Sequence, residues 1–151
     1  MRFLKEAYLD DTERLYDYGT EKVNNYNVDN FFDTSRTGFS YYDNFLNDKD
    51  LEYMQKSKGL TGHIEYISPK NYFKYCADFF NKNPIDLIQR IAEDEESLND
   101  LREVVTKYKR RIMLPYLNFS NRQQEGMHRM FVAAEIFSWD TKLPVLCIYN
   151  Y

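Results

Sequence analysis

The strongest fold signal in the sequence lies in residues 124–149, which read QEGMHRMFVAAEIFSWDTKLPVLCIY. A helix opens at Glu125–Gly126, because apolar side chains recur at helical spacing from Met127 to Phe137. The polar turn that follows leads into LPVLCIY (143–149), a near-continuous apolar run that is typical of a strand buried on both faces. The stretch therefore predicts a helix that leads into a buried strand.

Upstream of this stretch, strand and helix signals follow one another as in an α/β layout. HIEYI (63–67) alternates and is rich in β-forming residues, so it predicts a short strand. Two helices are expected next, each opened by a polar cap and a proline, at Ser68–Pro69 and at Asn83–Pro84. A third helix is expected from Ser97, whose spacing to Asp100 resembles a capping box. The residues expected to face the core are Phe73, Cys76, Ala77 and Phe80 in the first helix, Ile85, Ile88 and Ile91 in the second, and Leu98, Leu101, Val105 and Tyr108 in the third.

The segment IMLPYLNF (112–119) predicts another strand, in which Pro115 suits an edge or a bulge better than a central ladder. The order from residue 62 onward is then strand, three helices, strand, helix, strand. We therefore expect an α/β (α+β) domain over residues 62–151, with a small mixed sheet flanked by helices.

Residues 1–61 differ in composition from the rest of the chain. They hold 8 basic and 12 acidic side chains, so the whole net charge of −4 lies in this segment. Asn, Asp, Ser and Gly mix with Tyr and Phe here and show little periodicity. The segment predicts a loop-rich extension with short helices around 3–16 and 49–58. It could fold over the domain or present a partner-binding surface, and the first is favoured because so many exposed aromatic side chains would be costly.

The cysteines and the start of the chain bear on the compartment. Cys76 and Cys147 lie in apolar surroundings, which suits buried thiols in a reducing compartment better than a disulfide framework. His63 and His128 show no zinc-binding spacing with them, so no metal site is expected. The start is acidic where a signal peptide would be apolar, and no apolar run approaches the roughly 20 residues that cross a bilayer. We expect a cytoplasmic protein without membrane contact.

Two charged runs flank the third expected helix. Acidic residues 93–96 precede it and basic residues 107–111 follow it, and stabilisation of the helix dipole explains both runs. The alternative is that the basic end also contacts an anionic ligand. The acidic balance of the whole chain argues against a nonspecific DNA coat, which needs a basic surface.

The turn at Gly126 carries the residues with the clearest chemistry. Glycine lets the backbone approach a ligand closely, and the free amides of a first helical turn, with His128 and Arg129 beside them, favour a phosphate group. A second interpretation is a local ion pair between Glu125 and Arg129 on a solvated turn. The residues alone leave both interpretations open.

The run QEGMHRMFVAAEIF followed by LPVLCIY resembles the core of the ParB/sulfiredoxin-like superfamily, in the variant found in small phage and mobile-element proteins. In that superfamily an acidic or polar residue, Gly, any residue, His or Arg, and Arg open a helix that leads into an I/L-P-V strand. The similarity covers residues 62–151 and is most specific over 124–146. For a phage protein, the resemblance implies the cytoplasm of a bacterial host.

The resemblance implies nucleotide handling at this turn, with ATP or CTP and Mg²⁺ as the expected cofactors. Gly126, His128 and Arg129 match the phosphate-binding turn of the family, and Glu125 matches its acidic or polar leader. Met127 stands where sulfiredoxin has its catalytic cysteine, and a thioether cannot attack a phosphorylated sulfinate. Reductase activity is therefore not expected. Because no helix-turn-helix domain follows, a full chromosome-partition protein is not expected either.

Three functions follow as hypotheses. The first is a nucleotide-binding domain, an NTPase or phosphotransferase, with nucleotide-binding residues Gly126, Met127, His128 and Arg129, catalytic candidates Glu125 and His128, and Glu65 as an alternative metal ligand or base. The second is a nuclease or DNA-associated protein, which needs its basic groups on one face, namely Lys107, Lys109, Arg110, Arg111, Arg122 and Arg129. The third is a non-catalytic phage interaction protein that contacts a phage or host protein through Phe31, Phe32, Tyr41 and Tyr42.

Overall fold

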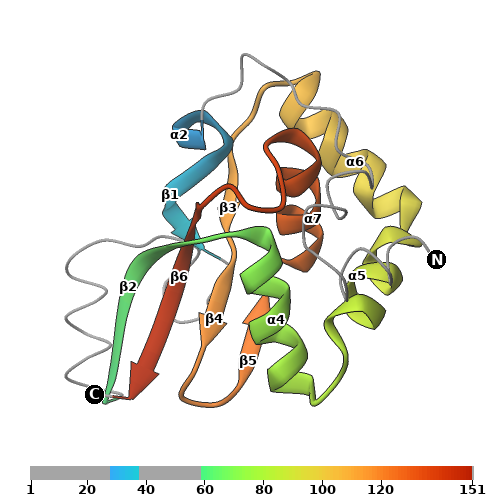
Figure 1. The fold of residues 1–151 in the computed structure, drawn as a ribbon. Helices are drawn as coiled ribbons and strands as arrows, with labels where there is room; N and C mark the ends of the chain where they lie inside the picture. The colour runs from blue at the N-terminus through green and yellow to red at the C-terminus, as the bar shows by residue number, and fades with distance from the viewer. Residues whose placement is uncertain (1–27, 38–58, 151) are drawn as a thin grey trace.

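Residues 28–37 and 59–150 are the part of the chain that the computed structural model describes, and they form an α+β fold with mixed strand directions (Figure 1). This is the fold class that the sequence predicts. In chain order the elements are α2 (Val28–Phe31), β1 (Phe32–Thr37), β2 (Leu60–Ile67), α4 (Pro69–Phe80), α5 (Pro84–Ala92), α6 (Glu95–Thr106), β3 (Ile112–Leu114), β4 (Tyr116–Asn118), β5 (Gln123–Glu125), α7 (Met127–Ile136) and β6 (Leu143–Asn150).

The first two expected helices begin at the predicted caps. The hydroxyl oxygen of Ser68 accepts a hydrogen bond from the Asn71 amide and starts α4. Asn83 starts α5 in the same way, and both helices have a proline in the first turn, where its missing N–H costs nothing. The expected apolar face of α5 is buried, and so is that of α4 except for Phe80, which is exposed.

Helix α6 departs from the prediction at both ends. It begins at Glu95 with Asp94 in the capping position, so the expected start at Ser97 is wrong by two residues. Two glutamates fill its first turn instead, where negative charge stabilises the helix dipole. The helix ends at Thr106, and Tyr108 therefore lies beyond it and is exposed rather than in the core.

Strand β6 lies at the centre of a four-stranded sheet in the order β2-β6-β4-β5. It pairs antiparallel with β2 and parallel with β4, and its residues 143–148 are buried, as the apolar run predicts. Strand β2 includes the predicted residues 63–67 and extends back to Leu60. The expected central strand and small mixed sheet are confirmed.

Pro115 divides the predicted strand 112–119 in two. The part before it, β3, pairs in parallel with β1, and the part after it, β4, pairs with β6 and with β5. Proline has no N–H to donate to a ladder, so the break falls where the sequence predicts an irregularity.

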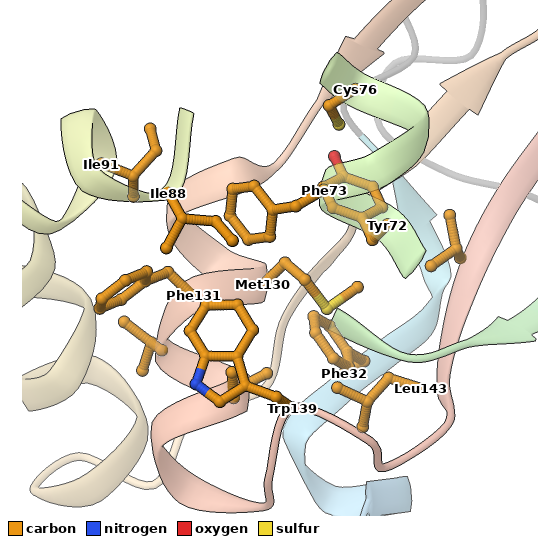
Figure 2. Close-up of a cluster of buried hydrophobic side chains, with 14 of the residues drawn as sticks. Phe32, Tyr72, Phe73, Cys76, Ile88, Ile91, Met130, Phe131, Trp139 and Leu143 are labelled. Carbon is orange, nitrogen blue, oxygen red and sulfur yellow. The ribbon is translucent and has the colours of Figure 1, made fainter. Parts of the chain in front are cut away.

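The core joins the sheet to α4, α5 and α7, and it includes residues from the N-terminal segment. Trp139 is fully buried, and the rings of Phe73 and Phe131 lie 5.8 and 5.7 Å from its ring, measured between centroids (Figure 2). Phe32 lies in the same cluster, and Phe31 is equally buried beside it. Part of the N-terminal segment therefore packs into the domain, as the favoured interpretation of that segment predicts.

Several predictions concern residues outside the described ranges. The helices expected around 3–16 and 49–58 and the contact residues Tyr41 and Tyr42 lie there. Within 28–37 and 59–150, none of the helices combines the length and the apolar character that crossing a lipid bilayer requires. Cys76 and Cys147 are free thiols in the buried core, as predicted.

Candidate functional site

The first turn of α7 presents backbone amides that no side chain caps. Gly126 precedes the helix with φ 115° and ψ 21°, and α7 has no side-chain cap hydrogen bond. The first amides of a helix have no acceptor within the helix, and the dipole makes this end positive. Such an end attracts an anion. The fold thus produces the strand-to-helix turn that the sequence predicts.

Gly126 is required here by packing. A Cβ at this position would lie 2.5 Å from the Cβ and 2.8 Å from the Cα of Pro115. The positive φ adds a second reason, since only glycine adopts this conformation without strain. Pro115 therefore occupies the space beside Gly126 in which we expected a ligand to approach the backbone closely.

A pocket of about 420 Å³ lies beside this turn. Its volume falls within the roughly 300–1,000 Å³ of small-molecule sites. Four of its lining residues are apolar and the rest are charged or titratable; the lining residues are Phe80, Lys82, Leu87, Arg90, Ile91, Asp94, Met127 and His128. The pocket therefore combines an apolar wall with cations at a helix N-terminus.

His128, in the first turn of α7, pairs with Asp94, the residue that precedes α6. The Nε2 atom of His128 lies 2.8 Å from the Oδ2 atom of Asp94, and both side chains are partly exposed. The hydrogen bond with His128 lowers the pKa of Asp94 below its usual value, so this carboxylate stays ionised. Asp94 is the carboxylate that lines the pocket, and it could hold a Mg²⁺ ion together with bound phosphate oxygens.

Arg129 does not line the pocket and pairs with Glu125. Its Nη1 donates to Glu125 Oε1 at 2.9 Å, and its Nη2 contacts Glu125 Oε2. The Arg129 side chain is only 12% exposed. The ion pair that the sequence left open is therefore formed, with Arg129 largely buried and the Glu125 side chain 41% exposed. Glu125 supplies the negative charge that an arginine near a helix N-terminus requires.

The turn is also held from the side of α4. The hydroxyl of the buried Tyr72 donates to the backbone carbonyl of Glu125 at 2.9 Å. Burial raises the pKa of Tyr72 well above its usual value, so the hydroxyl remains a neutral donor. The end of β5 and the start of α7 are thus fixed before any ligand arrives.

Of the predicted site residues, the structure brings Met127 and His128 into the pocket, with Gly126 directly before them. Glu125 and Arg129 are paired with each other and do not line it. Glu65 lies on β2 and accepts a hydrogen bond from Tyr149, so it belongs to a different part of the sheet. Sequence reasoning missed Lys82, Arg90 and Asp94, although positions 87, 90, 91 and 94 share the helical spacing of one face.

Parts of the structure do not fit the other two hypotheses, the nuclease or DNA-associated protein and the non-catalytic interaction protein. The basic groups do not gather on one face: the loop from α6 to β3 and the turn from β4 to β5, which carries Arg122, lie at opposite ends of the fold (Figure 1). Arg129 is engaged in its ion pair. Phe31 and Phe32 are buried, so they do not offer the proposed contact surface.

Comparison with known proteins gives no relative: no family model, no curated protein and no solved structure matches this chain. Among the described residues, no three His, Cys, Asp or Glu side chains gather in a way that could hold a metal ion by themselves.

Proposed function

We propose that the chain binds a nucleotide in the pocket at the start of α7, with the phosphates at the first helical turn. The observation that carries this proposal is the lining of the pocket. It combines Met127 and His128 from the helix start with the cations Lys82 and Arg90 and with further apolar side chains. A helix N-terminus with flanking cations suits phosphate, and an apolar wall suits a base. The resemblance to the ParB/sulfiredoxin-like superfamily supports the same proposal.

The roles within the pocket follow from the chemistry of each side chain. The amides of the first turn donate to phosphate oxygens, and Lys82 and Arg90 neutralise their charge. His128 donates to them through Nδ1 in its protonated form, because Asp94 holds its Nε2. Leu87 and Ile91 on α5 contact the base. ATP and CTP with Mg²⁺ are the proposed ligands, and the bound ion would neutralise phosphate charge beside Asp94.

Phosphoryl transfer is a further part of the proposal: a water or substrate hydroxyl oxygen would attack the γ-phosphorus, and the nucleoside diphosphate would leave. The imidazole of His128 lines the pocket and is the proposed carrier of the proton in this step. Asp94 orients its ring through the 2.8 Å contact. Glu125 remains a catalytic candidate only if it leaves Arg129, since the two are paired. Nucleotide binding does not depend on this step.

The test is thermal unfolding of the whole chain with millimolar ATP, CTP or GTP and Mg²⁺. A ligand that binds the folded state at 100 times its Kd adds about 2.7 kcal/mol of stability. Inorganic tripolyphosphate and adenosine, used separately, distinguish phosphate binding from base binding. The absence of a shift with all three nucleotides would contradict the proposal.

His128→Ala and Arg90→Ala should abolish most of the shift, because both side chains line the pocket and both are partly exposed. Lys142→Ala is the matched control, since Lys142 is an exposed cation outside the pocket. Arg129→Ala is a poor test of binding, because it leaves Glu125 without its partner and lowers stability by itself.

A further inference from the structure

The loop from α6 to β3 concentrates positive charge on an acidic protein. Its sequence is KYKRR (107–111), and all five side chains are exposed. Four cations lie within five residues of a chain whose net charge is −4. The loop therefore differs in electrostatic character from the rest of the molecule.

These four cations have no carboxylate partner within the described ranges. By contrast, Arg102, Arg122 and Arg129 each form an ion pair with a glutamate or an aspartate. Arg111 lies close enough to Asp33 to affect its pKa, but the Asp33 carboxylate accepts hydrogen bonds from Ser35. Among the described residues, therefore, only Asp33 acts electrostatically on this loop, through Arg111, and no ion pair neutralises Lys107, Lys109 or Arg110.

Helix stabilisation accounts for little of this charge. Helix α6 has no basic residue in its last turn, and Lys107 occupies the capping position, so Arg110 and Arg111 lie past the reach of the dipole. The sequence-based explanation by helix stabilisation therefore covers only the start of the run.

The loop is held in a defined conformation. The amides of Lys107 and Tyr108 both donate to the Glu103 carbonyl, at 2.9 and 3.1 Å, and the Arg110 amide donates to the Val104 carbonyl at 3.0 Å. Lys109 adopts a positive φ of 52°, which reverses the chain direction. The backbone thus presents the basic side chains from a fixed turn.

Tyr108 adds an aromatic face to the basic loop. Among the large hydrophobic residues of the described ranges, Tyr108 is the most exposed, at 57%. The Nζ atom of Lys107 lies 5.4 Å from its ring centroid, a cation–π contact that covers one face of the ring. The ring therefore stands among cations with surface available for stacking.

We propose that this loop binds single-stranded nucleic acid. Lys109, Arg110 and Arg111 contact successive phosphates, and Tyr108 stacks on an unpaired base. Cations that track a backbone beside an aromatic side chain are the common elements of single-strand binding. An acidic peptide would use the cations but leave the tyrosine ring without a role. A duplex would keep its bases stacked inside and away from the ring.

This surface is separate from the nucleotide pocket. The loop follows the C-terminal end of α6 and leads into β3 (Figure 1). The pocket includes Asp94, which caps the N-terminal end of α6, so the two sites lie at opposite ends of this helix. The inference therefore stands whether or not the chain binds a free nucleotide.

The experiment measures fluorescence anisotropy of a labelled oligothymidylate of about 15 nucleotides, titrated with the full chain at two salt concentrations. Arg110→Gln/Arg111→Gln should reduce the slope of log affinity against log salt by about 1.4, since each phosphate contact to a single strand contributes about 0.7. Tyr108→Ala should weaken binding on the order of tenfold through the lost stacking.

Matched controls separate these effects from loss of fold or binding elsewhere. Tyr66→Ala removes a tyrosine that is equally exposed, at 56%, on β2, and should leave the affinity unchanged. His128→Ala should also leave it unchanged, which shows that the oligonucleotide does not bind in the pocket.

Four results would contradict the proposal, three of them in full and the last in its stacking contact. The first is no anisotropy change at low salt. The second is equal affinity of wild type and Arg110→Gln/Arg111→Gln. The third is displacement of the oligonucleotide by polyglutamate at equal charge concentration, which would identify an acidic protein segment as the partner. Equal affinity for a duplex of the same sequence would likewise exclude base stacking by Tyr108.

Discussion

Replacement of Gly126 by alanine tests why a glycine stands before α7. An L-residue at a positive φ costs roughly 1–2 kcal/mol. The added Cβ would meet Pro115 at 2.5 Å, which is shorter than real contacts allow, and an overpacked site costs typically about 1–3 kcal/mol more. We therefore expect Gly126→Ala to lower the free energy of unfolding by about 3 kcal/mol. For a chain of 151 residues this corresponds to a fall in Tm of about 10 °C.

Gly59→Ala is the matched control for this experiment. Gly59 also has a positive φ, of 65°, but a Cβ there would meet nothing within 4 Å. Only the conformational cost applies, partly offset by the lower entropy of the unfolded chain, so we expect a loss of about 1 kcal/mol. The difference between the two variants measures the contact with Pro115.

The assay is chemical or thermal unfolding followed by circular dichroism, with the nucleotide shift recorded for each variant. Equal losses for Gly59→Ala and Gly126→Ala would refute the packing argument. A Gly126→Ala protein of unchanged Tm that no longer responds to nucleotide would show that the glycine serves the approach of a ligand instead.

Three further predictions follow from other contacts. The pKa of Asp94 is lower in the folded than in the unfolded protein. The stability from its pair with His128 is therefore present above pH about 4 and is lost as pH falls through the lowered pKa. Asp94→Asn should flatten the acid side of a curve of Tm against pH. Burial raises the pKa of the Cys76 thiol to about 12. Iodoacetamide at pH 8 should therefore leave Cys76 unmodified in the folded protein and label it in guanidinium. Labelling without denaturant would contradict the burial of this thiol. Arg102→Gln should lower the free energy of unfolding in urea by about 1–3 kcal/mol, because Glu135 on α7 loses its partner on α6. An unchanged urea midpoint would show that this ion pair does not hold the two helices together.

The fold was predictable where local signals agree with the final packing. The caps at Ser68 and Asn83 act within one turn of chain, and the apolar run of β6 reflects burial on both faces. Pro115 breaks a strand through its own covalent structure. Such features need no knowledge of distant residues.

The missed elements depend on distant partners. Strand β1 reads FDTSRT, without an apolar alternation, and forms because β3 offers it a parallel edge far along the chain. Strand β5 is three polar residues whose hydrogen bonds to β4 define it. In α6, Asp94 and Ser97 both look like caps, and the neighbouring contact of Asp94 with His128 is a tertiary one.

In the candidate site, too, the sequence predicts the local features and misses those that depend on distant residues. The turn at Gly126 and the ion pair between Glu125 and Arg129 involve residues no more than four positions apart, so the sequence indicates both. That Lys82, Arg90 and Asp94 face this turn depends on how α5 packs against α7, which no local pattern specifies.

The burial of Phe31 and Phe32 limits how far the chain can be shortened. A fragment that starts at Gly59 would lose both rings from the interior and would leave the backbone of β3 without the strand that pairs with it. Unpaired strand edges beside vacated apolar space promote association between molecules. Any smaller version for crystallography or NMR therefore has to keep the residues from Val28 onward, covalently or as an added peptide.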